Sequence, residues 1–127
     1  MRKVRIRIGK SSMEVELQDT PTADAIFLAA PFESRATTWE GEVYFTVPVK
    51  AELEPGARSV VKPGELAYRV EGEVVVIAYG PTLLSEGEEI RLARPENIWG
   101  RCDVDIRAMA KVEPGELIVV EPVAAED

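Results

Sequence analysis

The chain has 127 residues, a net charge of −8 at pH 7, one cysteine and no histidine. This length suits a single domain, residues 1–127, that can bury a core without disulfides or a metal. The acidic charge and scattered basic residues argue against nucleic acid or a membrane surface as a partner, and a chain with one cysteine and no histidine cannot build Ser-His-Asp, Cys-His or zinc sites.

The start of the chain and its single cysteine favour a cytoplasmic protein. The segment MRKVRIRIGKSS carries charges but no apolar stretch of the kind that a signal peptide needs. No apolar run approaches the length that spans a membrane. Cys102 cannot form an internal disulfide, which is typical of a reducing compartment.

The first predicted elements are two strands, residues 3–8 and 13–17, because apolar and polar side chains alternate in both. Gly9-Lys10 lies between them, with glycine first as a type II′ hairpin turn prefers. This turn pairs Ile6 with Met13. It also places Arg5 opposite Glu14 and Lys3 opposite Glu16, contacts that contribute about 0.2–1 kcal/mol each.

A helix is predicted next, near residues 22–30. Thr20 or Thr22 can cap it, Pro21 suits a first turn and Pro31 ends it. Its interior is apolar nearly all round, so we expect it to be covered on most sides.

Residues 41–49 alternate as a strand. We expect Val43, Phe45 and Val47 to point into the core and Glu42, Tyr44 and Thr46 to point outward.

A second hairpin is predicted around Glu71-Gly72, and its second arm, residues 73–80, is apolar on both faces. This arm should be a central strand with another layer over its outer side. Two short strands, 90–93 and one beginning at 97, precede a helix near 104–111 and a closing strand, 116–123. Many short strands with few helices indicate a sandwich or a barrel. The three Pro-Gly pairs are predicted to be turns.

The order of these segments resembles a small cyclophilin-like family of prokaryotic proteins of uncharacterised function. The resemblance covers nearly the whole chain and departs from the family at Trp39-Glu40-Gly41, at Leu83 or Leu84, and at Trp99. The segments that carry it are PFES with Thr38-Trp39, EVYF with Pro48-Val49, GELAY, GPT with Ser85, and Asn97-Ile98 with Gly100-Arg101.

The resemblance implies a mainly β fold, a closed eight-stranded antiparallel barrel capped by two helices. Residues 33–39 would be its third strand and residues 41–48 its fourth. True cyclophilins isomerise prolyl bonds with the arginine of a Phe-His-Arg segment in the third strand. The nearest match here is Glu33-Ser34-Arg35.

Two functions follow from this comparison. The favoured one is a non-enzymatic module that binds a small polar molecule or an extended peptide on the outer barrel face. The alternative is a weak or divergent prolyl isomerase that uses Arg35, which we weigh against a solvated arginine at a strand edge. Neither needs a cofactor or a metal, and the oligomeric state is left open, a homo-oligomer included.

The candidate ligand-binding residues are Arg35, Tyr44, Tyr79, Thr82 and Ser85. Tyr44 should face outward beside Arg35, and the loop after Tyr79 offers two hydroxyls next to them. Such a set would supply aromatic walls, a cation and two hydroxyls. The alternative for Thr82 and Ser85 is that they cap their own turn.

Three further features have plainer interpretations. The acidic loop 86–89 is typical of a solvated turn rather than of a calcium site or a catalytic pair. Cys102 is expected to be a packed small side chain rather than a nucleophile. Trp39 and Trp99 are both expected in the core.

Overall fold

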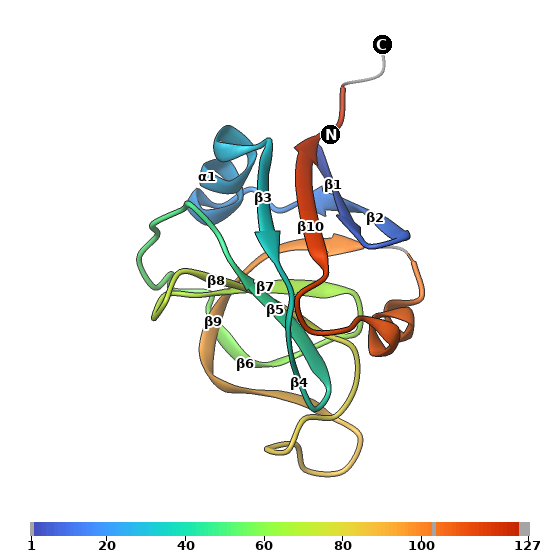
Figure 1. The fold of residues 1–127 in the computed structure, drawn as a ribbon. Helices are drawn as coiled ribbons and strands as arrows, with labels where there is room; N and C mark the ends of the chain where they lie inside the picture. The colour runs from blue at the N-terminus through green and yellow to red at the C-terminus, as the bar shows by residue number, and fades with distance from the viewer. Residues whose placement is uncertain (1, 103, 125–127) are drawn as a thin grey trace.

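The computed structural model describes residues 2–102 and 104–124, which form a mainly β, antiparallel, nearly closed barrel (Figure 1). One α-helix, one 3₁₀ helix and ten strands make up the described part. The elements are β1 (Lys3–Ile8), β2 (Ser11–Leu17), α1 (Pro21–Ala29), β3 (Phe32–Arg35), β4 (Thr37–Trp39), β5 (Glu42–Thr46), β6 (Arg58–Val61), β7 (Glu65–Arg69), β8 (Val74–Ala78), β9 (Ile90–Cys102), η1 (Ile106–Lys111) and β10 (Leu117–Pro122).

The barrel closes through the backbone at Ala36. The strands are hydrogen-bonded in the order β3-β10-β1-β2-β9-β7-β8-β5-β4, so the two ends of the sheet are β3 and β4. These two strands are consecutive in the chain and are separated only by Ala36, whose N–H donates to Glu116 O at 2.9 Å. The predicted third strand is therefore present in two parts, one paired with β10 and the other with β5.

The predicted first hairpin is confirmed. Ile6 lies opposite Met13, Arg5 opposite Glu14 and Lys3 opposite Glu16. Gly9 has a φ of +57° while Lys10 does not have a positive φ, as a type II′ turn requires.

Two apolar clusters hold the strands together. The larger fills the barrel, and its largest side chains, Trp99, Tyr68 and Phe45, are each at most 1% exposed. The smaller lies on the outer side of β7 and β8, beneath β6 and the first half of β9, and consists of Val61, Ala67, Val74, Val76, Ala78, Ile90 and Leu92. All five residues of β8 are buried, which confirms that a second layer covers its outer side.

Residues 90–102 form one strand, whereas two were predicted. β9 curves from its pairing with β6 to its pairing with β7 and β2 (Figure 1). Its middle is irregular, because Arg91 pairs with Val60 and Glu96 pairs with Arg58. Pro95 lies in this bulge, where its missing N–H breaks no ladder hydrogen bond.

The strand β6 was not predicted. Its sequence is short and lies between two Pro-Gly turns, so it carries little periodicity of its own. The described chain has ten strands against the eight that the resemblance implies, and β6 and the division of the third strand at Ala36 are two of the differences.

Both predicted helices are present at the expected positions, but the burial of the first and the type of the second differ from the prediction. Helix α1 begins after Thr20, whose side chain accepts a hydrogen bond from Ala23 N. It is not covered on most sides, since only one face meets the barrel and Leu28 is 81% exposed. The predicted helix near 104–111 is the short 3₁₀ helix η1. Neither α1 nor η1, the two helices of the described chain, is long and apolar enough to cross a membrane.

A buried polar cluster joins α1, the segment between β5 and β6, and β9. Asn97 is fully buried, and its Oδ1 accepts from Glu54 N at 2.8 Å. Its Nδ2 donates to Thr22 Oγ1 at 3.0 Å and to Glu52 O at 2.9 Å. Glu54 in turn accepts from Thr22 N at 2.9 Å. The Asn97 side chain of β9 thus satisfies three polar groups, one from α1 and two from the segment between β5 and β6.

We predict that Asn97→Ala lowers the free energy of unfolding by about 2–4 kcal/mol, because it leaves buried backbone groups without partners. Urea unfolding monitored by circular dichroism measures this. Glu52→Ala is the matched control, since only the backbone oxygen of Glu52 takes part, and it should change stability by less than about 0.5 kcal/mol. Equal losses in both variants would contradict the assignment.

Candidate functional site

Arg35 lies on the outer side of the barrel wall, at the end of β3. The next residue, Ala36, is 4% exposed and belongs to the core, so strand alternation turns Arg35 outward. Its Nη1 donates to Gly115 O at 3.2 Å, in the turn before β10. Arg35 pairs with neither Glu33 nor Glu42.

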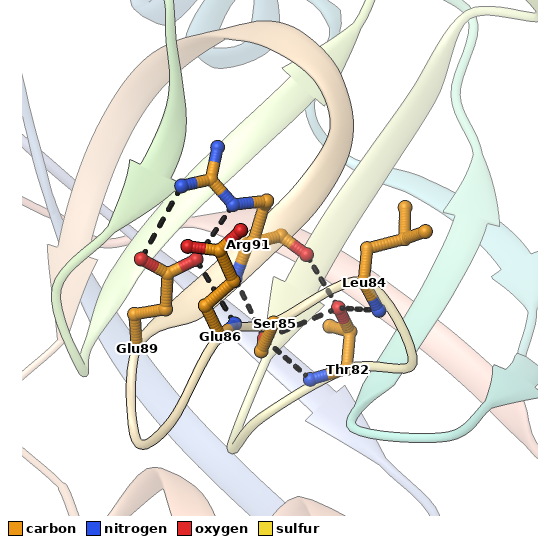
Figure 2. A network of polar contacts seen from close by, with 6 residues as sticks. All are labelled: Thr82, Leu84, Ser85, Glu86, Glu89 and Arg91. Atoms are coloured by element: carbon orange, nitrogen blue, oxygen red, sulfur yellow. Dashed lines mark hydrogen bonds and ion pairs between the residues drawn. The ribbon is translucent and has the colours of Figure 1, made fainter.

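Thr82 and Ser85 use their hydroxyls inside their own loop, as Figure 2 shows. Thr82 Oγ1 donates to Arg91 O and accepts from Leu84 N. Ser85 Oγ accepts from Thr82 N at 2.9 Å and from Arg91 N at 3.0 Å. These contacts connect the loop to the start of β9. They agree with the alternative that Thr82 and Ser85 cap their own turn.

The acidic stretch of the same loop is tied to one arginine. Arg91 Nε donates to Glu89 Oε2 at 2.6 Å, and Glu86 N donates to the same carboxylate at 3.2 Å (Figure 2). The hydrogen bond from Arg91 lowers the pKa of Glu89. Glu88 and Glu86 are exposed. The loop is therefore a solvated turn that the ion pair between Arg91 and Glu89 stabilises.

The two tyrosines of the predicted site lie in different cavities. Tyr79, just after β8, lines a cavity of about 760 Å³, whereas Tyr44, in β5, lines one of about 220 Å³. Arg35, Thr82 and Ser85 line neither. The structure therefore does not gather the five predicted residues around one of these cavities.

The larger cavity, which we call the η1 cavity, lies at the end of the barrel next to η1. Arg101 and Arg107 offer guanidinium groups to it, and Glu88 and Asp105 offer carboxylates. The full lining is Pro63, Gly64, Tyr79, Gly80, Pro81, Glu88, Ile90, Arg101, Cys102, Val104, Asp105, Ile106 and Arg107.

The charged groups of the η1 cavity are not equivalent. Arg107 donates two side-chain hydrogen bonds to Asp105, at 3.0 and 2.9 Å, and holds the pKa of that carboxyl at about 2. Arg101 makes no ion pair with any residue in the described ranges 2–102 and 104–124. Glu16 of β2 and Glu65 of β7 lie opposite Arg101 on the neighbouring strands without forming an ion pair with it, so its guanidinium has no fixed carboxylate partner in the described chain.

Cys102 also lines this cavity but is 5% exposed and packs within the barrel cluster. This agrees with its interpretation as a packed side chain. The two tryptophans differ from each other: Trp99 is in the core, and its Nε1 donates to Ala67 O at 3.1 Å, whereas Trp39 is 36% exposed and lies outside the core. The expectation for Trp39 was wrong, because it ends the short edge segment β4.

The smaller cavity, which we call the carboxyl cavity, contains two buried acids that the sequence analysis did not select. Its lining is Trp39, Glu42, Tyr44, Arg69, Ala93 and Glu96. Glu42 does point outward from β5 as predicted, but it is only 5% exposed, and Glu96 of β9 is 2% exposed. The alternation of side chains along β5 could not predict this burial, because the second layer that covers these side chains comes from a distant part of the chain.

Neither acid has a direct partner within the described chain. No hydrogen bond or ion pair reaches the Glu42 or Glu96 side chain, and Glu96 Oε1 is a fully buried oxygen without a donor. Burial, followed by the charge of Glu42, raises the pKa of Glu96 to about 7. Burial also raises the pKa of Glu42, and the charge of Arg69 partly opposes this.

Residues 2–121 match the protein family described as Cyclophilin-like. The chain belongs to the Cyclophilin-like family. Among solved structures, it is similar to the solution structure of the hypothetical protein AF2241 from Archaeoglobus fulgidus, with 36% identity and a TM-score of 0.80 over 94% of this chain and 93% of that one. No curated protein matches the chain. The family suggested by the sequence segments is confirmed for this Cyclophilin-like protein.

We predict that Glu96→Gln stabilises this Cyclophilin-like protein at pH 8 and not at pH 4. The folded pKa of Glu96, about 7, lies above the ordinary value of 4.5. As the pH rises from 4.5 to 7 the unfolded chain therefore releases this proton first, and folded wild-type protein loses stability that the glutamine variant keeps. The gain at pH 8 should be roughly 1–3 kcal/mol.

Urea unfolding over a pH series measures this gain. Glu40→Gln is the matched control, because Glu40 is exposed in the turn between β4 and β5 and its neutralisation should leave the pH profile unchanged. A Glu96→Gln curve parallel to wild type at all pH values would show that Glu96 titrates normally.

Proposed function

We propose that this Cyclophilin-like protein is a non-enzymatic binding module for a small polar molecule, which it holds in the η1 cavity. The size of that cavity, about 760 Å³, carries the proposal. It falls within the range of roughly 300–1,000 Å³ that small-molecule sites occupy. Of the residues predicted to bind a ligand, Tyr79 contributes to this cavity, and the site proposed here therefore differs from the one expected on the outer face of β5.

The lining favours a ligand with an anionic group. Arg101 forms no ion pair with a carboxylate in the described chain, and guanidinium groups bind carboxylates and phosphates through two parallel hydrogen bonds. Tyr79 and Ile106 supply an aromatic and an aliphatic surface for the rest of the molecule. An apolar wall with a few convergent polar groups is typical of sites for small molecules.

The isomerase alternative receives less support from the geometry. Prolyl isomerisation needs an arginine that donates toward the proline amide nitrogen beside an apolar pocket. Arg35 instead donates to the Gly115 carbonyl and lines neither the η1 cavity nor the carboxyl cavity.

We predict that a thermal-shift screen of small carboxylates and phosphates identifies a ligand whose affinity falls at least about tenfold in Arg101→Gln, since a hydrogen bond to a charged group contributes about 1.5–3 kcal/mol. Isothermal titration measures the affinities. Arg7→Gln is the control, because Arg7 is an exposed arginine of β1 that pairs with Glu121 away from the cavity. Equal affinities in the two variants would place the ligand elsewhere.

We also predict no measurable acceleration of Xaa-Pro isomerisation in a standard peptide assay, because the arginine-donor geometry is missing. The Arg35→Ala variant should be indistinguishable from wild type in that assay. A rate comparable to that of a true cyclophilin, lost in Arg35→Ala, would establish the isomerase instead.

A further inference from the structure

The carboxyl cavity holds a charge pattern that the protein does not satisfy by itself. Two carboxyl groups face it, from Glu42 at the start of β5 and from Glu96 in β9, and both residues are at least 95% buried. Glu96 Oε1 has no hydrogen-bond donor. Buried acids are normally paired or hydrogen-bonded, because an isolated buried charge is strongly unfavourable.

One cation, Arg69, lines the cavity but does not pair with the acids. The Arg69 guanidinium carbon lies 5.6 Å from the centre of the Tyr44 ring, and Arg69 Nε donates to Glu71 O at 3.0 Å. Arg69 forms no ion pair with Glu42 or Glu96. When both acids are ionised, the lining therefore carries two negative charges against one positive charge.

The walls of the cavity suit a particular kind of cation. Trp39, which is 36% exposed, and Tyr44 line it together with the two acids. Aromatic faces attract organic cations, and carboxylates accept their N–H hydrogen bonds. A volume of about 220 Å³ is below that of a drug-sized site and matches a small head group.

We propose that the carboxyl cavity binds a small organic cation, an ammonium or guanidinium group on a short alkyl chain. The cation donates an N–H hydrogen bond to the Glu96 carboxyl group where that side chain lines the cavity, and it lies against Trp39. Glu42 supplies the second carboxylate. This site shares no lining residue with the η1 cavity. The proposal therefore does not depend on the function proposed for the η1 cavity.

The test follows the indole N–H resonance of Trp39 in ¹⁵N-labelled protein at pH 8, with Trp39→Phe to assign it. Methylguanidine and n-butylamine are the probes, and tetramethylammonium is the control cation because it has no N–H. We expect the two probes to shift the resonance saturably, with a Kd on the order of 1 mM, as suits ligands of few atoms. Tetramethylammonium should bind at least about tenfold more weakly, as should any cation without a donor for Glu96.

Matched variants test the two carboxylates. Glu96→Gln and Glu42→Gln keep the shape of the side chains and should each weaken methylguanidine binding about tenfold or more, whereas Glu40→Gln, outside the cavity, should leave it unchanged. Circular dichroism confirms that each variant is folded. Unchanged affinity in the two cavity variants, no saturable shift in wild type, or tetramethylammonium binding as tight as that of methylguanidine overturns the proposal. Tight binding of Mg²⁺ or Ca²⁺ in place of both probes also overturns it.

The same titration at pH 6 gives an independent result. The charged groups that act on Glu96 are Glu42 of β5, Arg69 and Glu71 of the β7–β8 hairpin, and Arg94 of β9 itself. A carboxyl with a pKa of about 7 is mostly protonated at pH 6, so methylguanidine should bind roughly tenfold more weakly than at pH 8. Equal affinity at the two pH values overturns the proposal that the ionised Glu96 carboxylate binds the cation.

Discussion

The closure of the barrel at Ala36 is the constraint on which the rest of this structure depends. Because β3 and β4 are the two ends of the sheet and are joined by one residue, the backbone itself connects the wall of the barrel. The Ala36 side chain enters the core, and its neighbours on both sides turn outward. β5 continues the sheet from this point, paired with β4 on one edge and with β8 on the other.

The second layer explains why polar groups on that outer face are not all solvated. β6 and the first half of β9 cover the outer side of β7 and β8 with an apolar cluster of their own. Where this layer ends beside β5, it encloses Glu42 and Glu96 instead of apolar side chains. Burying two acids without partners costs stability, and proteins retain such arrangements chiefly at functional sites.

The two cavities differ in the chemistry that they present. The η1 cavity is large and has a guanidinium, Arg101, that is available to an anion. The carboxyl cavity is small, has an excess of negative charge and has aromatic walls, which suits a cation. Opposite charge preferences at separate positions allow each proposal to be tested without disturbing the other.

The sequence by itself determined the local elements and the family. Alternation and turn residues predicted the first hairpin to the residue pair, Ile6 with Met13, because strand periodicity and hairpin turns are local properties. They also predicted helix α1 and the burial of β8.

Only the tertiary structure decided which residues share a cavity. Glu42 and Glu96 lie far apart in the chain, and they line one cavity because the layer that contains the first half of β9 lies over the outer side of the sheet that contains β5. The hydroxyls of Thr82 and Ser85 were equally ambiguous in sequence, since a ligand and the backbone of their own loop can use the same donors and acceptors. Long-range packing resolves such choices, because burial and charge pairing are properties of the assembled chain rather than of a segment.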